Sequence, residues 1–171
     1  MEYPVPRHLR ALLRIDTKHS NAAHIGGTVV CKCGCERFGI LHNADAPYDD
    51  SLPYGAHPGM KIKGICADCG AAHLLLDAAV HGYDGFVCHD YKSALDSSLT
   101  PLQCGKCGAG TFGIRLDIEA EDREQFIAEC VSDAPDEFVP EDYVDAFGWI
   151  TVTVTCDACH RKDTWIDLET A

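Results

Sequence analysis

Basic residues are scarce in this chain of 171 residues, which holds 14 lysines and arginines against 27 aspartates and glutamates. The formal net charge at pH 7 is −13, and the few cations, such as Lys61, Lys63 and Arg161, are scattered. Binding of a nucleic-acid backbone depends on clustered lysines and arginines that displace condensed counterions. The composition therefore argues against a nucleic acid as the partner and favours another protein.

Long apolar runs are also absent. No stretch approaches the roughly 20 apolar residues that a membrane-spanning helix needs. Arg7, Arg10 and Arg14 interrupt the apolar residues at the start of the chain, unlike the core of a secretory signal. We therefore expect no membrane partner and a cytoplasmic location. In a reducing cytoplasm, closely spaced cysteines bind metals more often than they form disulfides.

Closely spaced cysteines are the feature that the chain does have. Eight of its 11 cysteines form four short pairs, which are Cys31 with Cys33, Cys66 with Cys69, Cys104 with Cys107, and Cys156 with Cys159. Each pair and the turn that joins it form a knuckle, and two knuckles together make a tetrahedral thiolate site suited to Zn²⁺. The sequence predicts two Zn²⁺ ions, each held by four of these cysteines, with iron as the nearest competitor for the same ligands.

The first knuckle leaves a choice of ligands, because its sequence is Cys31-Lys32-Cys33-Gly34-Cys35. A knuckle bends back most easily when glycine follows its second ligand, since glycine tolerates positive φ. Gly34, Gly70 and Gly108 hold that position, whereas the fourth knuckle has His160. This rule selects Cys31 and Cys33 as ligands, and Cys35 remains the alternative to either of them.

The two halves of the chain align with each other. Residues 33–40 match residues 107–114, with the same distance from cysteine to a Phe-Gly-Ile ending, and Asp77 and Asp167 follow the second knuckles at one offset. We interpret this pattern as an internal duplication.

Alternating β-branched and aromatic residues predict strands on both sides of each knuckle pair. Short helices are expected in three places, at residues 6–15, 122–130 and 140–147. An irregular loop is expected at residues 43–59, which are rich in proline and glycine. The fold class that follows is mainly β with short helices.

Each half resembles a zinc ribbon, the small rubredoxin-like β module in which two knuckles share one zinc ion. The likeness covers Val30 to Asp77 and Gln103 to Asp167, and the chain also resembles uncharacterised bacterial proteins with paired ribbons. The resemblance implies two duplicated zinc-ribbon units of small antiparallel sheets, and it implies no activity. Rubredoxins carry proline within a knuckle and this chain does not, so zinc is favoured over iron. The expected domains are an N-terminal helical segment (1–29), a first ribbon (30–80), a linker loop (81–101) and a second ribbon with a helical insertion (102–171).

The predicted linker contains a second group of reactive side chains. Cys88 with His81 or His89, and with Asp84 or Asp90, has the composition of a nucleophile set or of a third metal site. The favoured interpretation is a turn-rich loop whose Tyr83 and Phe86 pack between the ribbons, because neighbours in sequence need a specific turn to meet. Of the remaining side chains, Cys130 is expected in the core, and His57 and His73 are expected at the surface.

A four-thiolate zinc site has no open position for water or substrate, so it stabilises a fold without activating a nucleophile. The sequence therefore predicts a non-catalytic, zinc-binding protein-interaction or adaptor module. Two alternatives remain, an enzyme that uses Cys88 with His81 or His89, and iron-based electron transfer.

Overall fold

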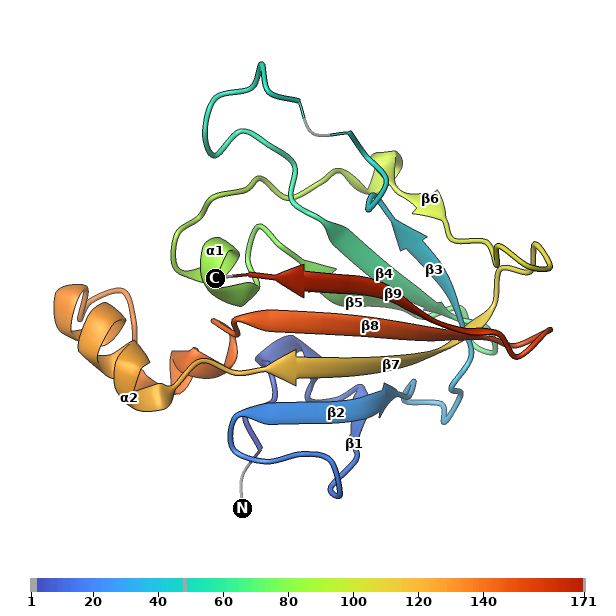
Figure 1. Ribbon diagram of the computed structural model, residues 1–171, viewed down its shortest axis with the longest axis horizontal. Coiled ribbons are helices and arrows are strands. Elements are labelled where there is room, and N and C mark those ends of the chain that lie inside the picture. Colours follow the sequence, from blue (N-terminus) through green and yellow to red (C-terminus); the bar gives the residue numbers. More distant parts are fainter. Residues whose placement is uncertain (1–2, 48, 171) are drawn as a thin grey trace.

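The computed structural model describes residues 3–47 and 49–170 and is built mainly from antiparallel β strands (Figure 1). The strands are β1 (Leu13–Ile15), β2 (His24–Val29), β3 (Phe38–His42), β4 (Lys61–Cys66), β5 (Ala72–Asp77), β6 (Thr100–Pro101), β7 (Phe112–Glu119), β8 (Trp149–Cys156) and β9 (Lys162–Glu169). The helical pieces are short, namely η1 (Arg7–Leu9), α1 (Gly82–Phe86), η2 (Asp96–Ser98), α2 (Arg123–Phe126), the π-helical turn η3 (Ile127–Val131) and η4 (Pro140–Val144). The expectation of a mainly β protein with short helices is confirmed.

The strands form two arms of one curled sheet. The first arm consists of β6, β3, β4 and β5, and the second consists of β1, β2, β7, β8 and β9. The arms are joined where Phe38 of β3 pairs with Phe112 of β7. Away from this junction the arms face each other, and the ring of Trp165 meets that of His42 edge-on at 4.9 Å. One contiguous hydrophobic core includes buried residues of both arms.

The two arms repeat the same strand register around their second knuckles. Phe38 lies opposite Cys66 in the first arm, and Phe112 lies opposite Cys156 in the second. Both hairpins also contain a register shift at the same place, after Ile62 and after Val152, four residues before the knuckle cysteine in each case. This correspondence supports the duplication inferred from the sequence, which stays a prediction.

The helix expected over residues 6–15 is wrong. Only a 3₁₀ turn forms at Arg7–Leu9, and Leu13–Ile15 instead pairs antiparallel with β2 as an edge strand. The apolar leucines are nevertheless buried, because a strand also turns Leu13 toward the core. This pairing needs a close approach, since a Cβ on Gly27 would lie 2.8 Å from the Leu13 side chain.

The insertion in the second half is helical as expected. Asp122 accepts a hydrogen bond from the Gln125 amide and so caps α2, which continues into η3. Cys130 is buried with Phe126 and Phe138, as predicted. Residues 140–147 contain the short 3₁₀ helix η4, which begins at Pro140.

Two expectations are corrected, one for the segment between the halves and one for the loop at residues 43–59. Tyr83 and Phe86 do not pack between the arms but against the helical insertion around Cys130 and Phe138, because α1 turns them away from the sheet. His57 is buried, with 8% of its surface exposed, because its loop is tied to the following segment by a bond from the Lys92 amide to the His57 carbonyl.

Candidate metal centres

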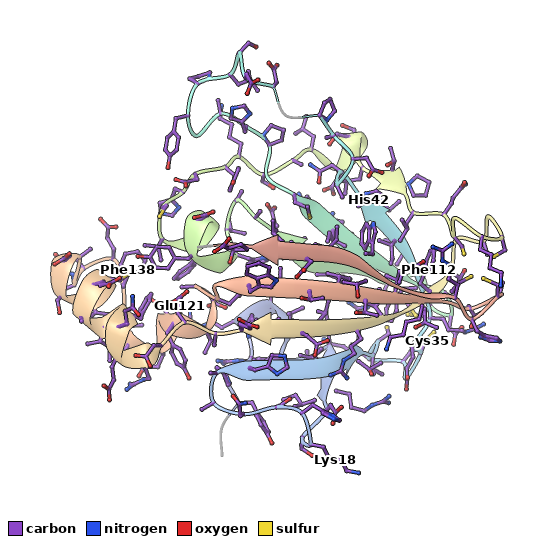
Figure 2. The ribbon with its side chains drawn as sticks, viewed as in Figure 1. Lys18, Cys35, His42, Phe112, Glu121 and Phe138 are labelled. Atoms are coloured by element: carbon purple, nitrogen blue, oxygen red, sulfur yellow. The ribbon has the colours of Figure 1, made fainter. Side chains whose placement is uncertain are left out.

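Eight cysteine sulfurs meet in two groups of four. Cys31, Cys33, Cys66 and Cys69 form site one, and Cys104, Cys107, Cys156 and Cys159 form site two. Within each group the ligand atoms all lie within 4.8 Å of one another. Both groups lie at the end of the molecule where the two arms converge, near the labelled Cys35 and Phe112 (Figure 2).

The sulfur spacings fit a tetrahedral metal. Four sulfurs about 2.3 Å from a central Zn²⁺ lie about 3.8 Å apart. In site one the Cys31 and Cys69 sulfurs are 3.6 Å apart and those of Cys33 and Cys66 are 3.5 Å apart. In site two both the Cys104–Cys159 and the Cys107–Cys156 pairs are 3.6 Å apart. The donor set is therefore arranged for one metal ion at each site.

The knuckle backbone shows why glycine follows the second cysteine. Gly34, Gly70 and Gly108 have φ values of 90°, 72° and 74°, in the left-handed region that glycine occupies without steric cost. His160 adopts the same conformation with φ 58°. The conformation points the amides of the turn back toward the first cysteine, and His160 tolerates it at a modest cost.

Cys35 lies outside both four-sulfur groups. In three knuckles the amide of the first cysteine donates to the carbonyl of the fifth residue after it, which is Ala71, Ala109 or Arg161. In the first knuckle, one residue shorter, the Cys31 amide donates to the carbonyl of Cys35 instead. Cys35 is buried, and its sulfur accepts a hydrogen bond from the Arg37 amide at 3.3 Å. Its position is thus the one that alanine or arginine occupies in the other knuckles.

Backbone amides favour the thiolate form of the first cysteine in two of the four knuckles, those of Cys66 and Cys104. The amides of Cys69 and Asp68 lower the pKa of the Cys66 thiol to about 6. The amides of Lys106 and Cys107 lower the pKa of the Cys104 thiol to about 6. Because thiolates rather than thiols bind metals, these turns prepare both sites for a cation.

Arg37 connects the two sites. Its guanidinium contacts the Asp68 carboxylate of the site-one knuckle at 2.7 Å and the Asp157 carboxylate of the site-two knuckle at 3.6 Å. The carbonyl of Arg37 also accepts from the Ala67 amide, as Thr111 accepts from the Asp157 amide in the other half. Arg37 thereby fixes the second knuckles of both sites relative to each other.

His73 is the site residue that sequence reasoning missed. Its Nε2 lies 3.2 Å from the Cys31 sulfur, within hydrogen-bond distance of one of the four sulfurs of site one. The corresponding residue of site two is Asp163, which pairs with Arg161 instead. Nothing in the sequence indicates this contact, because His73 is far from Cys31 in the chain. The two residues meet only once β5 pairs with β4.

We expect His73 to stabilise metal binding at site one alone. A hydrogen bond from outside the ligand set orients the ligand and typically changes metal affinity by about 10–100-fold. His73→Ala should therefore accelerate chelator-driven metal release from one of two sites, measured with a chromogenic chelator, while the second phase stays unchanged. Asp163→Ala serves as the control from the other half. Equal acceleration of both phases, or of neither, would contradict this role.

The side chains expected around Cys88 do not form a nucleophile set. Cys88 is exposed, and the groups within 4.8 Å of its sulfur in the same cluster are the carboxylates of Asp84 and Asp90, without a histidine. Burial, and then Asp90 and Asp84, raise the pKa of the Cys88 thiol. An activated cysteine needs a lowered pKa, whereas the pKa of this thiol is raised and the neighbouring carboxylates disfavour its thiolate.

His81 is instead stacked on His8, with ring centroids 3.6 Å apart and planes inclined by 6°. Its Nδ1 accepts a hydrogen bond from the Asp77 amide at 3.0 Å, and Nε2 of His8 lies 3.1 Å from the Leu75 carbonyl. Burial lowers the pKa of both rings, that of His81 to about 3. The pair is therefore neutral at physiological pH.

This histidine pair predicts a loss of stability in mild acid. The unfolded chain binds these protons near pH 6.5 and the folded chain does not. Stability is therefore fully present above pH 6.5 and falls as the pH drops toward 3. Because of His81, the free energy of unfolding should fall by up to about 1.4 kcal/mol for each unit that the pH drops. Denaturant unfolding of wild type and His81→Phe at pH 7, 6 and 5 measures this slope, and it should be shallower in the variant. Parallel curves would refute the prediction.

Comparison with protein-family models, curated proteins and solved structures finds no match to this chain. Among the described residues, no helix is long and apolar enough to cross a membrane.

Proposed function

We propose that this chain is a zinc protein whose two four-cysteine sites are structural and whose role is to bind another protein. The observation that carries the proposal is the pair of closed groups of four sulfurs. Four thiolates fill the tetrahedral coordination of Zn²⁺ and leave no position for substrate or water. Each ion would hold the two knuckles of its arm together, and this is the work of a structural rather than a catalytic metal.

Metal analysis tests the zinc assignment directly. We expect two zinc ions per chain and a colourless protein by elemental analysis and visible absorption. Cys31→Ser and Cys104→Ser should each remove one ion, whereas Cys35→Ser should retain both, since Cys35 lies outside the sulfur groups. If the protein instead contains stoichiometric iron and has the colour of an iron–thiolate protein, the zinc assignment is wrong and the electron-transfer alternative takes its place. Loss of one zinc ion in Cys35→Ser would overturn the ligand set of site one.

An apolar groove supports the proposed interaction with another protein. It lies between α1 and the helical insertion and is lined by Val80, Gly85, Phe86, His89, Glu137 and Phe138. Val80 is 50% exposed, as is the adjacent insertion residue Val139. Apolar side chains displayed beside carboxylates are typical of contacts with proteins. Since the chain carries a net charge of −13, a partner with a basic rim would complement it.

Comparative affinity purification tests this surface. Proteins retained by the wild-type chain from cell extract should be lost with Val80→Asp and kept with Leu95→Asp. Leu95 is a matched control because it is 73% exposed but lies outside the groove. If the retained proteins are unaffected by Val80→Asp, or are lost equally with both variants, the groove is not the binding surface.

A further inference from the structure

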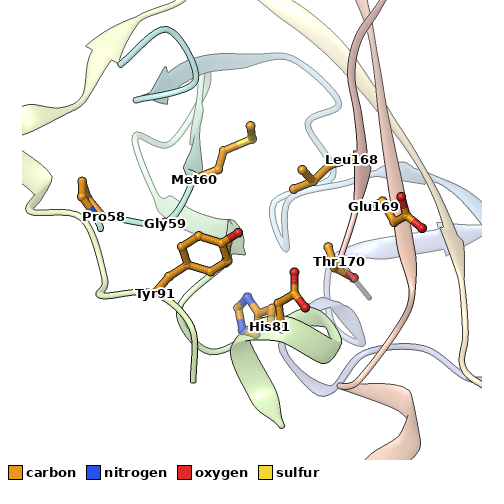
Figure 3. A pocket seen from close by; sticks show the side chains of 10 residues that line it. Pro58, Gly59, Met60, His81, Tyr91, Leu168, Glu169 and Thr170 are labelled. Carbon is orange, nitrogen blue, oxygen red and sulfur yellow. The ribbon is translucent and has the colours of Figure 1, made fainter. Parts of the chain in front are cut away.

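A small cavity lies between α1, the start of β4 and the end of β9. Its volume is about 140 Å³, the space of roughly five water molecules. Figure 3 shows Met60, Leu168 and Tyr91 around this space, with His81 at its floor. Asp84 and Glu169 also line it. We call it the His81 cavity.

The charge of the His81 cavity is negative and uncompensated. Its lining includes Asp84, which is half-buried, and Glu169, which is exposed, and it contains no lysine or arginine. Among the described residues, no basic group lies within salt-bridge distance of either carboxylate. Burial, and then the neighbouring Asp90 and Glu169, raise the pKa of Asp84. A cation in the cavity would remove this repulsion.

His81 adds a hydrogen-bond donor. The side chain is 9% exposed, and its Nδ1 accepts from the Asp77 amide, so the neutral ring carries its proton on Nε2. One face of the ring is covered by His8. Among residues 3–47 and 49–170, no protein partner for Nε2 is found, and the buried unsatisfied side-chain atom there is instead Nδ1 of His8. Nε2 faces the cavity without a protein partner, so a ligand that enters with an acceptor oxygen meets an available donor there.

The other residues that line the cavity restrict the size and polarity of the ligand. Met60 and Leu168 supply apolar surface, and the ring of Tyr91 offers an aromatic surface of the kind that attracts organic cations. The volume is well below the roughly 300–1,000 Å³ of drug-sized sites, so the ligand has only a few heavy atoms. These walls suit a short carbon chain better than a hydrated metal ion, which needs oxygen ligands on several sides.

We propose that the His81 cavity binds a short primary ammonium ion that carries a hydroxyl group, the chemistry of a small amino alcohol. The ammonium group pairs with Asp84 and Glu169, the hydroxyl oxygen accepts from His81 Nε2, and the short chain packs on Met60 and Leu168. This site is distinct from both four-cysteine groups and independent of any protein partner.

Titration of the zinc-loaded protein with 3-amino-1-propanol, followed by backbone amide NMR shifts, tests the site. We expect saturable shifts confined to residues around the cavity, such as Ala78, Asp84 and Thr170, at roughly millimolar ligand. The compound 1,3-propanediol replaces the ammonium group with a hydroxyl and should bind at least tenfold more weakly. Equal binding of the two compounds, or saturation by Mg²⁺ but not by the amine, would overturn the proposal.

Asp84→Asn gives the sharpest variant, because it keeps the size of the side chain and removes its charge. We expect at least tenfold weaker binding of the amine together with a higher Tm of the free protein, since the substitution relieves carboxylate repulsion. If Asp84 had only a structural role, the substitution would lower both the amine affinity and the Tm. Glu124→Gln removes one exposed charge from α2 and should change neither. Amine binding by Asp84→Asn at wild-type strength would refute the proposal.

Discussion

Removing the metal at neutral pH is expected to unfold most of the β structure, and this is the largest effect predicted for the chain. A structural zinc site contributes an apparent 10–16 kcal/mol or so, comparable to the whole stability of a domain. Excess EDTA should abolish the cooperative thermal transition seen by circular dichroism, and added Zn²⁺ should restore it.

The loss should involve both arms, because the two sites share one junction. Phe38 and Phe112 join β3 to β7 beside the knuckles, and Arg37 contacts carboxylates of both sites. Cys31→Ser in site one should therefore lower the Tm of the whole chain in one transition, whereas Cys88→Ser should leave it within a degree or two. A metal-free protein with an unchanged Tm would show that the sites do not stabilise the fold.

Truncating Phe38 is expected to cause the largest loss of stability from a single change outside the cysteines. Its side chain is fully buried, pairs in register with Cys66 and Phe112, and lies against Gly64, where an added Cβ would be 3.3 Å from the Phe38 ring. Phe38→Ala leaves a cavity at the junction of the arms and should cost about 3–5 kcal/mol.

Denaturant unfolding with saturating zinc measures this cost. Phe38→Leu should cost clearly less, because it fills most of the volume. Tyr54→Ala is the surface control, since Tyr54 is 82% exposed, and it should change the free energy of unfolding by no more than about 0.5 kcal/mol. A cost for Phe38→Ala no greater than that for Tyr54→Ala would mean that the junction does not support the core.

Local chemistry made much of the candidate site predictable. The spacing of the cysteines and the glycine after the second ligand depend on the conformation of four or five consecutive residues, and the structure has those turns with positive φ at each position. The strands beside the knuckles were also predictable, because alternating apolar and polar residues indicate a strand with one buried face.

Features that depend on distant partners were not predictable in this way. Leu9, Leu12 and Leu13 have helical spacing, but β2 offers an edge to pair with, and Leu13–Ile15 becomes a strand. The strand β2 itself was missed, since Gly26 and Gly27 weaken the local preference for strand. Those glycines instead permit close packing against Arg115 and Leu13.

The sequence alone determined the eight clustered cysteines, the type of turn that holds them and the mainly β character of the chain, because these follow from residue types a few positions apart. The tertiary structure decided the position of Cys35 outside the sulfur groups and the contact of His73 with Cys31. It also decided the stacking of His8 on His81 and the cavity beside it. Each of these depends on segments that meet across long separations in sequence, and such contacts are set by burial of the shared core rather than by local pattern.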